Sequence, residues 1–543
     1  MILKIKFDHS NKNLLALALA SAILLGFSFP PFPLGILASV GFVPFLLLAD
    51  SIPSYSRFFR YSYFTFFIFC AITLYWVGGF THLKDPYLMF AGGALLLWQP
   101  LFFTIPASLY YFVKKSYSSV YGVISFPFIW LTFEWLYALG EFAFPWLTMG
   151  NSQTYNLEKI QFIEFTGVYG LSLWILLMNI LVFLLIHFFR RNKSSKQVKY
   201  LTVAILVWYL APNFYSMAVN KQKYLSPSKK EITIGIVQPN IDPWDKWEGA
   251  NTFQGRWRQA ESYLTFMKDH VNKKTDMILL PESAILLNLP ALSDQFFEFK
   301  KETDSLNIAV ISGYAKVKYY EANEAPVSSS IIKGTNIHYD SFNSIFFIEP
   351  GTNSAQTYSK MRLVPFAERI PYADDVPFLI EPLRWGVGIS NWGLGKDSTL
   401  FFSKKLNSHF LAMICYESIF PEFVSRFVDK GAEFLVFITN DSWWGNTSGA
   451  RQHQQYAVLR AIENRRWVAR CANGGISSFI DPYGDEYDKT AMYTQTYIER
   501  KIYPLQDKTF YTKHGDWLAR ICASVALFII LFTMSYQFIL RKK

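Results

Sequence analysis

Long apolar runs fill most of the first 218 residues of this 543-residue chain and return near residue 517. A helix needs about 20 mostly apolar residues to cross about 30 Å of hydrocarbon. Such runs lie at 14–29, 34–50, 59–80, 87–113, 119–138, 169–189, 200–218 and 517–540. The sequence therefore predicts a membrane α-helical bundle of about eight spans. Proline and Glu134 interrupt the second and fifth runs, which are the weakest candidates.

The first run also has the length of a signal-peptide core. No small-residue cleavage site follows it clearly, and seven further runs come after it, so we expect a retained helix.

Basic residues in short loops predict the orientation of the bundle. They gather before the first run, after the last, and in every second loop between, whereas the alternate loops hold few, such as Lys84 and Lys159. Both termini are therefore expected in the cytoplasm, and the long polar segment outside it. Four lysines near the start of that segment run against this rule, but long domains translocate largely regardless of charge.

The chain is predicted to have three parts: transmembrane helices in 1–218, a catalytic domain in 219–515, and a last helix with a cytoplasmic tail in 516–543. The net charge of +11 comes mostly from the loop bias and a basic outer domain. Because no basic–aromatic binding module is present, we expect no nucleic-acid partner. Basic residues near the outer leaflet would instead attract anionic lipid head groups.

Short β-rich runs recur through the outer domain, with helical or looping stretches between them. The strand candidates are 232–238, 277–280, 308–314, 344–350, 410–414, 434–439 and 476–484, and amphipathic stretches lie at 252–271 and 453–467. This alternation predicts an α/β domain of layered sheets.

Residues 383–396 break the pattern, because they mix glycines with Trp385 and Trp392. They indicate a loop whose tryptophans either dip into the membrane interface or pack, partly buried, on the domain surface.

Three reactive side chains follow short apolar runs: Glu282 in LLPESA, Lys360 in YSKMRLVPFAE and Cys415 in AMICYES. A carboxylate, an amine and a thiol at strand ends can together carry acyl transfer through a thioester. Each also has an ordinary structural interpretation: a helix-capping Glu, a surface Lys and a buried core Cys. A disulfide between Cys415 and Cys471 is another alternative, and it would silence the thiol. Cys and His spacings match no metal motif, and we expect neither metal nor cofactor.

The order and context of these residues resemble the nitrilase superfamily: Glu in PES, Lys before P-F-x-E, and Cys in C-Y-E. Together with the apolar runs, several further motifs resemble the bacterial apolipoprotein N-acyltransferase family over essentially the whole chain. They are FPWLTMGNSQ (144–153), GVYGLS (167–172), LVPFAE (363–368), NDSWWG (440–445) and GDW (515–517). The sequence departs from that family at Ala367, where Gly is usual, and at Phe342, where Tyr is usual.

The resemblance implies an extracytoplasmic α-β-β-α sandwich and an enzyme of the bacterial inner membrane with its catalytic domain on the periplasmic side. Its reaction would move an acyl chain from a phospholipid, typically phosphatidylethanolamine, to the N-terminal diacylglyceryl-cysteine of an apolipoprotein, the last step of lipoprotein maturation. By the same resemblance Glu282 would act as base and Cys415 as nucleophile. Lys360 and the backbone N–H of Tyr416 would hold the oxyanion.

Further residues carried over from the family have supporting or binding roles. The supporting residues are Glu368, Tyr416 and Glu417, and the substrate-binding candidates are Trp247, Trp385, Trp392, Asn343, Trp443 and Trp444. On sequence alone, ordinary packing explains Trp247, Trp443 and Trp444 about as well, helix capping explains Glu417, and an exposed position beside Arg369 explains Glu368. Three other functions stay open: a membrane-anchored amidase for small amides, a transporter using Glu134 and Glu141, and a non-catalytic lipoprotein-binding scaffold.

Overall fold

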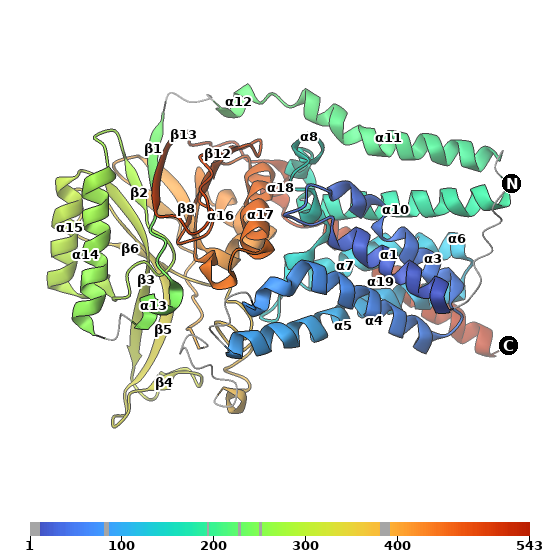
Figure 1. Ribbon diagram of the computed structural model, residues 1–543, viewed down its shortest axis with the longest axis horizontal. Helices are drawn as coiled ribbons and strands as arrows, with labels where there is room; N and C mark the ends of the chain where they lie inside the picture. Colours follow the sequence, from blue (N-terminus) through green and yellow to red (C-terminus); the bar gives the residue numbers. More distant parts are fainter. Residues whose placement is uncertain are drawn as a thin grey trace. The chain divides into compact units, whose positions relative to one another are not determined.

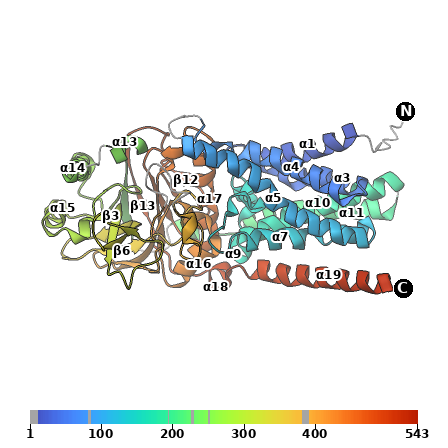
Figure 2. The same ribbon diagram turned by 90° about the horizontal axis from the view of Figure 1, so that it is seen from below.

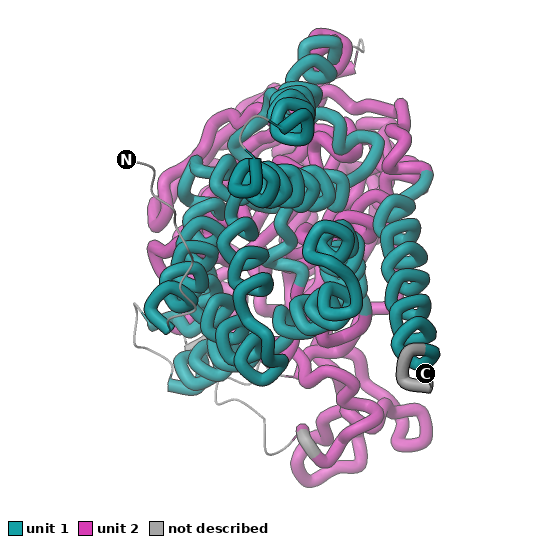
Figure 3. The backbone as a smooth tube through the Cα atoms, turned by 90° about the vertical axis from the view of Figure 1, so that its right-hand side faces the viewer, with its two compact units in different colours: residues 1–139, 145–219, 514–543 teal, residues 140–144, 220–513 magenta. Residues whose placement is uncertain are grey.

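The computed structural model describes residues 11–80, 86–192, 195–225, 230–248, 252–380 and 391–542. The chain divides into two compact units (Figure 3). One holds residues 1–139, 145–219 and 514–543, and the other holds residues 140–144 and 220–513. The three domain ranges expected from the sequence, 1–218, 219–515 and 516–543, stay predictions.

The first unit is helical, as predicted. Among the described residues, six helical segments are long and apolar enough to cross a membrane. Three of them are the single helices α5 (Pro86–Ser116), α10 (Val168–Arg191) and α11 (Lys196–Ala218). The segment Tyr55–Gly78 contains α4 (Tyr55–Leu74), and Ser119–Leu136 contains α6 (Ser119–Val123) and α7 (Phe126–Leu136). The last segment, Trp517–Ile539, belongs to α19 (Trp517–Lys542). Figure 2 shows α4, α5, α7 and α10 running roughly parallel to one another.

Two predicted spans are shorter helices. The first is α1 (Asn11–Gly26), and the second combines α2 (Ala38–Gly41) and α3 (Val43–Ser51). Prolines at 30, 31 and 33 follow α1, and proline is poorly tolerated in a helix interior. The count of eight spans and their orientation stay predictions.

Glu134 is buried on α7 rather than lining an open path. Its Oε1 accepts hydrogen bonds from Trp130 Nε1 (3.1 Å) and Met149 N (2.9 Å). These bonds tie α7 to η4 (Met149–Gln153). The Glu134 carboxylate therefore has a structural role in this unit, which weakens the transporter hypothesis. Other short helices described in this unit are α8 (Leu157–Ile160), α9 (Ile163–Thr166), η1 (Gly35–Leu37), η2 (Tyr75–Gly78) and η3 (Pro145–Leu147).

The second unit contains two sheets. The first has the order β13-β1-β2-β3-β5-β4, with β6 also paired to β5, and β1, β2 and β3 are parallel. The second has the order β12-β11-β10-β9-β8-β7, with β8, β9 and β10 parallel. The strands of the first sheet are β1 (Ile232–Gln238), β2 (Met277–Leu279), β3 (Ala309–Tyr320), β4 (Ser330–Ile331), β5 (His338–Ile348), β6 (Gln356–Ser359) and β13 (Thr496–Ile502). Those of the second are β7 (Phe401–Ser403), β8 (Ser408–Ile414), β9 (Phe434–Thr439), β10 (Val468–Ala472), β11 (Ser478–Ile480) and β12 (Glu486–Tyr487).

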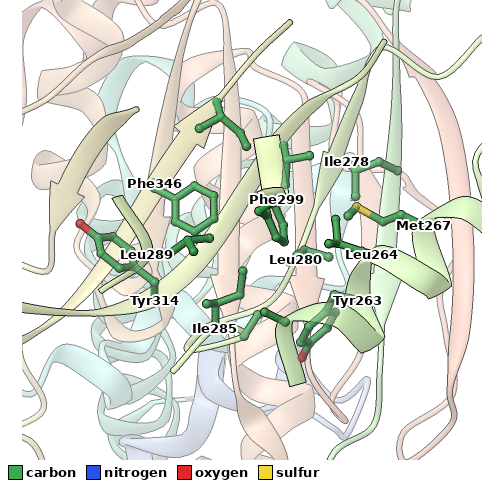
Figure 4. Packing of buried hydrophobic residues seen from close by; sticks show 14 of the residues in the cluster. Tyr263, Leu264, Met267, Ile278, Leu280, Ile285, Leu289, Phe299, Tyr314 and Phe346 are labelled. Atoms are coloured by element: carbon green, nitrogen blue, oxygen red, sulfur yellow. The ribbon is translucent and has the colours of Figure 1, made fainter. Parts of the chain in front are cut away.

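Helices cover the outer faces of the two sheets (Figure 1). α14 (Phe253–His270) and α15 (Ser293–Ser305) pack on the first sheet, and α16 (Pro421–Asp429) and α17 (Ser448–Asn464) lie on the second. Figure 4 shows the first of these layers, in which Leu264 and Phe299 meet Ile278 and Phe346 in one buried cluster. Burial of apolar area of this kind stabilises a fold by about 25 cal/mol per Å².

The inner faces of the sheets pack against each other. Phe347 on β5 and Phe410 on β8 have ring centroids 5.1 Å apart. At the other end, Cys471 Sγ on β10 donates to the carbonyl of Val237 on β1 at 3.4 Å. The unit is therefore an α-β-β-α sandwich, and the predicted fold class is confirmed.

Strand predictions were most accurate where a strand is buried on both faces. β1 and β9 match the predicted ranges, whereas β3 and β5 continue beyond theirs into a polar hairpin. β10 and β13 carry arginines among their apolar residues, and no strand was predicted there. α17 begins earlier than the predicted stretch and is buried almost all round, so it is not amphipathic. The remaining short helices of this unit are α12 (Gln222–Leu225), α13 (Pro243–Glu248), η5 (Leu289–Ala291), η6 (Pro377–Leu379), η7 (Cys415–Ile419) and η8 (Asp441–Trp444). The helix α18 (Phe510–His514) begins in this unit, whose last residue is Lys513.

Candidate active site

The three reactive side chains stand just beyond the ends of three strands of the sandwich. Glu282 follows β2, Lys360 follows β6 and Cys415 follows β8. Gly313 on β3 permits this arrangement at Glu282, because a Cβ there would lie 2.4 Å from Ser283 N and 2.8 Å from Glu282 Cα. The strand-end positions predicted from the apolar runs are those that the structure shows.

Cys415 occupies a strained turn. Its φ is +50°, a region that residues other than glycine rarely adopt. The turn is fixed on both sides of the residue. Glu417 Oε2 accepts from Ile414 N at 2.9 Å, and the Cys415 carbonyl accepts from Ser418 Oγ at 2.8 Å and from His453 Nε2 at 3.1 Å. The surrounding hydrogen bonds therefore hold the thiol in one position at the turn.

The Cys415 thiol is 8% exposed and forms no disulfide, as is true of all four cysteines. Burial, followed by the negative charge of Glu282, raises the pKa of the Cys415 thiol well above its ordinary value, while Lys360 acts in the opposite direction. The resting thiol is therefore neutral, and it needs a base before it can attack.

Glu282 is buried, and both of its oxygens accept hydrogen bonds. Oε1 accepts from Asn343 Nδ2 at 2.6 Å and lies 3.5 Å from Lys360 Nζ. Oε2 accepts from the backbone N–H of Asn440 at 2.9 Å. These contacts fix the carboxylate beside Lys360, where its charge acts on the Cys415 thiol.

Lys360 is almost fully buried, at 1% exposure. Its Nζ donates to Glu368 Oε1 at 2.7 Å, which is shorter than its distance to Glu282. Burial alone would lower the pKa of Lys360, but the charges of Glu368 and then Glu282 and Cys415 hold it above the ordinary value. The side chain is therefore a fixed ammonium in a site of low dielectric constant, where it interacts strongly with negative charge.

Glu417 joins the Lys360 segment to the Cys415 turn. Its Oε1 accepts from Tyr358 Oη (2.5 Å), Met361 N (2.7 Å) and Arg362 N (3.2 Å). Burial raises the pKa of Glu417 above its usual range, while Tyr358 and the backbone donors oppose the shift. A carboxylate bonded to both segments in this way fixes the distance between them. The neighbouring Tyr416 is buried and donates from its hydroxyl to the carbonyl of Ala143 at 2.7 Å.

Two features of the site were not predicted from sequence. One is a buried network behind Cys415, in which Asp441 contacts His453 Nδ1 at 2.8 Å and Arg470 at 2.7 Å. Despite burial, Arg470 and then His453 hold the pKa of Asp441 well below its ordinary value. Asp441 lies in the NDSWWG motif, but Arg470 is 29 residues away along the chain.

The second feature that was not predicted is Lys246 on α13, whose Nζ lies 3.3 Å from the carbonyl oxygen of Glu282. Lys246 is 3% exposed, and burial lowers its pKa to about 7 although Glu282 opposes the shift. In the sequence, only its position directly before the substrate-binding candidate Trp247 pointed to a role for Lys246.

The other predicted residues fall into three groups. Asn343 lies among the charged groups, since its Nδ2 also reaches Glu368 Oε1 at 3.3 Å. Trp443 and Trp444 follow Asn440 and pack on Trp244 (5.0 Å between ring centroids) and His453 (6.0 Å). Trp392 is 6% exposed and donates its backbone N–H to the Glu368 carbonyl at 2.9 Å, which places it inside the fold. The Trp247 side chain and Trp385 lie outside the described residues.

Comparison with known proteins gives matches along both halves of the chain. Residues 21–181 match the family model described as apolipoprotein N-acyltransferase N-terminal domain, and residues 233–507 match the carbon-nitrogen hydrolase model. A carbon-nitrogen hydrolase-type domain thus follows a membrane half of the acyltransferase type.

Curated relatives match over nearly the full length. An apolipoprotein N-acyltransferase of Chlorobaculum tepidum is 35% identical over 94% of this chain and 94% of its own. One from Geobacter metallireducens is 29% identical over 96% of this chain and 95% of its own. Among solved structures, Saccharomyces cerevisiae Nit3, a member of the nitrilase superfamily, matches at 17% identity with a TM-score of 0.34, covering 53% of this chain and 94% of its own. By the family models and these relatives, the chain belongs to the apolipoprotein N-acyltransferase family.

Proposed function

We propose that this membrane protein transfers an acyl chain from a glycerophospholipid, such as phosphatidylethanolamine, to an apolipoprotein. The acceptor would be the α-amino group of the N-terminal diacylglyceryl-cysteine. The observation that carries the mechanism is the buried, strained and neutral Cys415 under the charges of Glu282 and Lys360. Family membership supports the acceptor, because the curated relatives are named for lipoprotein N-acylation.

In the first half-reaction, Glu282 takes the proton from Cys415 Sγ, and the thiolate attacks the ester carbonyl carbon of the phospholipid. The tetrahedral oxyanion is held by Lys360 Nζ and the backbone N–H of Tyr416, contacts of a type worth roughly 3–4 kcal/mol. The ester C–O bond then breaks, and Glu282 returns the proton to the departing oxygen. A lysophospholipid leaves, and a thioester remains on Cys415.

In the second half-reaction, the α-amine of the apolipoprotein attacks the thioester carbonyl, and Glu282 removes a proton from the amine nitrogen. The C–S bond breaks, the thiolate regains a proton, and an amide is released. Because one product leaves before the second substrate reacts, the scheme requires ping-pong kinetics. We place the enzyme in the bacterial inner membrane with the sandwich on the periplasmic side, on the strength of the loop charges.

Intact-protein mass spectrometry after incubation with phosphatidylethanolamine tests the proposal. The wild type should gain one fatty-acyl mass that hydroxylamine removes, and Cys415→Ala should gain none. Cys471→Ala is the matched control, because Cys471 is also buried and lies on β10, outside the Cys415 turn. A wild type that never acquires the acyl mass, yet hydrolyses simple amides, would replace the proposal with an amidase.

A further inference from the structure

A pocket of about 300 Å³ lies beside the proposed active site, within the second unit. Its lining includes Met361 and Arg362, which directly follow Lys360, and Phe420, which lies five residues after Cys415. It also includes Ala143, whose carbonyl receives the Tyr416 hydroxyl. The volume is at the lower end of small-molecule pockets, roughly 300–1,000 Å³, so it suits a head group and not two acyl chains.

Arg362 presents an unneutralised guanidinium to this pocket. The group lies over the rings of Phe420 and Phe423, 5.5 Å and 5.6 Å from their centroids. Within the part of the chain that the structure describes, it forms no ion pair with any carboxylate. Its backbone N–H is bonded to Glu417, so the residue is fixed relative to the reactive groups. A stacked arginine with free donors is well suited to bind a phosphate through two parallel hydrogen bonds.

Glu141 lines the same pocket and supplies a negative charge. One of its oxygens accepts the backbone N–H of Tyr372 at 2.7 Å, and it forms no ion pair with any described residue. The pocket's other arginine, Arg369, is already paired with Asp374 at 2.9 Å. Among the described residues, the pocket therefore offers one cation and one anion without an ion-pair partner, a pattern complementary to a zwitterion.

Three exposed aromatic rings lie around Glu141 and this pocket. Phe142, Phe366 and Tyr372 are 50%, 43% and 40% exposed, and Phe142 lies 6.0 Å and 5.6 Å from the other two ring centroids. Phe366 is held at φ +62°, so the exposed ring sits on a strained backbone. Tyrosine is favoured at the membrane–water interface, and clusters of exposed apolar side chains mark sites of membrane or partner contact. They favour a lipid-borne ligand over free phosphate.

We propose that this pocket binds the zwitterionic head group of the donor phospholipid, with Arg362 on the phosphate and Glu141 on the ammonium group. The inference rests on the proposed function, because it places the donor's head group beside the thiol that accepts its acyl chain. It assigns donor selectivity to two residues outside the Glu282, Lys360 and Cys415 set.

The test measures acyl-enzyme formation by the full-length protein in detergent micelles, as a function of donor mole fraction. The donors are phosphatidylethanolamine, phosphatidylglycerol and a p-nitrophenyl ester of a short fatty acid, which has neither phosphate nor amine. Arg362→Met should raise the apparent KM for both phospholipids about tenfold or more, as expected for loss of a charge-assisted hydrogen bond. It should leave the p-nitrophenyl ester unaffected, and Arg362→Lys should recover part of the loss. Glu141→Gln should raise KM for phosphatidylethanolamine but not for phosphatidylglycerol.

Arg426→Gln is the matched control, since this exposed arginine on α16 loses the same charge and is not among the residues that line the pocket. It should react as the wild type does with all three donors. In the wild type, added glycerophosphoethanolamine should compete with phosphatidylethanolamine and not with the p-nitrophenyl ester.

The two proposals fail in different ways. If Arg362→Met keeps the wild-type KM for phosphatidylethanolamine while Cys415 is still acylated, the head-group inference is wrong and the proposed function stands. An equal loss with the p-nitrophenyl ester also contradicts the inference, because it assigns Arg362 to folding or to the reaction itself. If no donor acylates Cys415 in the wild type, the proposed function fails, and the inference fails with it.

Discussion

Lys360 Nζ lies 2.7 Å from Glu368 and 3.5 Å from Glu282, so the ammonium is bound more closely to the carboxylate that we do not propose as the base. This asymmetry matters for catalysis. A carboxylate in a short ion pair with a lysine is a weaker base. Because the shorter contact of Lys360 is with Glu368, Glu282 remains available as the proposed base. Glu368 is itself held by the Val364 N–H at 2.8 Å, so it positions Lys360 from a fixed point.

Replacing Glu368 by Gln should slow acylation of Cys415 by about 10- to 100-fold, the range expected from losing a charged hydrogen bond of roughly 1.5–3 kcal/mol. The reason is that Lys360 would then pair only with Glu282. Single-turnover rates of acyl-enzyme formation measure the effect. Glu422→Gln, which removes a partly buried carboxylate paired with the exposed Arg426, should keep the wild-type rate. A Glu368→Gln rate equal to the wild type's would show that Glu368 does not position Lys360.

Asp441→Asn should destabilise the second unit by about 3–5 kcal/mol, because removing one partner leaves Arg470 buried without its counter-charge. The effect should depend on pH. The pKa of Asp441 is held below its unfolded value near 3.9, so its stabilisation is complete above that pH and is lost as the pH falls below it. Thermal unfolding measured from pH 7 down to pH 3 should therefore show a constant difference down to about pH 4, below which the wild type and the variant begin to converge. For Asp429→Asn, a more exposed site, we expect little change.

Lys246 predicts a pH dependence of the same sign in a higher pH range. Its pKa is about 7 in the folded protein and about 10.4 in an unfolded chain, so between these values the unfolded state binds more protons. Its contribution to the free energy of unfolding should therefore rise as the pH increases from about 7 to about 10. Compared with Lys246→Met, the wild type should gain stability over this window in chemical unfolding experiments. Lys268→Met changes the same charge at a half-exposed site and should show no such trend. A constant difference across the window would contradict burial of a titrating amine beside Glu282.

The periplasmic location of the sandwich can be tested at Gly334. This residue is exposed between β4 and β5, and no atom lies within 4 Å of the position that its Cβ would take. An alkaline phosphatase inserted there should be active, because that enzyme needs the oxidising compartment to form its disulfides. A fusion at the C-terminal end should be inactive. Activity in the reverse pattern would overturn the orientation inferred from loop charges.

The sequence determined the class of each half and the strand-end positions of the proposed reactive residues. Apolar runs set the helical half, because helices satisfy their own backbone hydrogen bonds in lipid. Doubly buried strands such as β1 and β9 read as continuous apolar runs, and the reactive residues stand directly after such runs. Local order along the chain was sufficient for these features.

Other features depend on residues that are distant in sequence, and only the tertiary structure decided them. The Cys415 turn is held by Glu417 and by His453 from α17, and the base is held by Asn343 and by the Asn440 N–H from β5 and the end of β9. Lys246 and Arg470 look like ordinary surface cations in the sequence, because burial and pairing depend on the packing of other segments. Likewise, Arg362 and Glu141 are 221 residues apart in numbering (362 − 141), and the fold places both in the lining of one pocket. The sequence thus supplied the candidates for the reacting groups, while their charge, their orientation and the pocket beside them arose from contacts between distant parts of the chain.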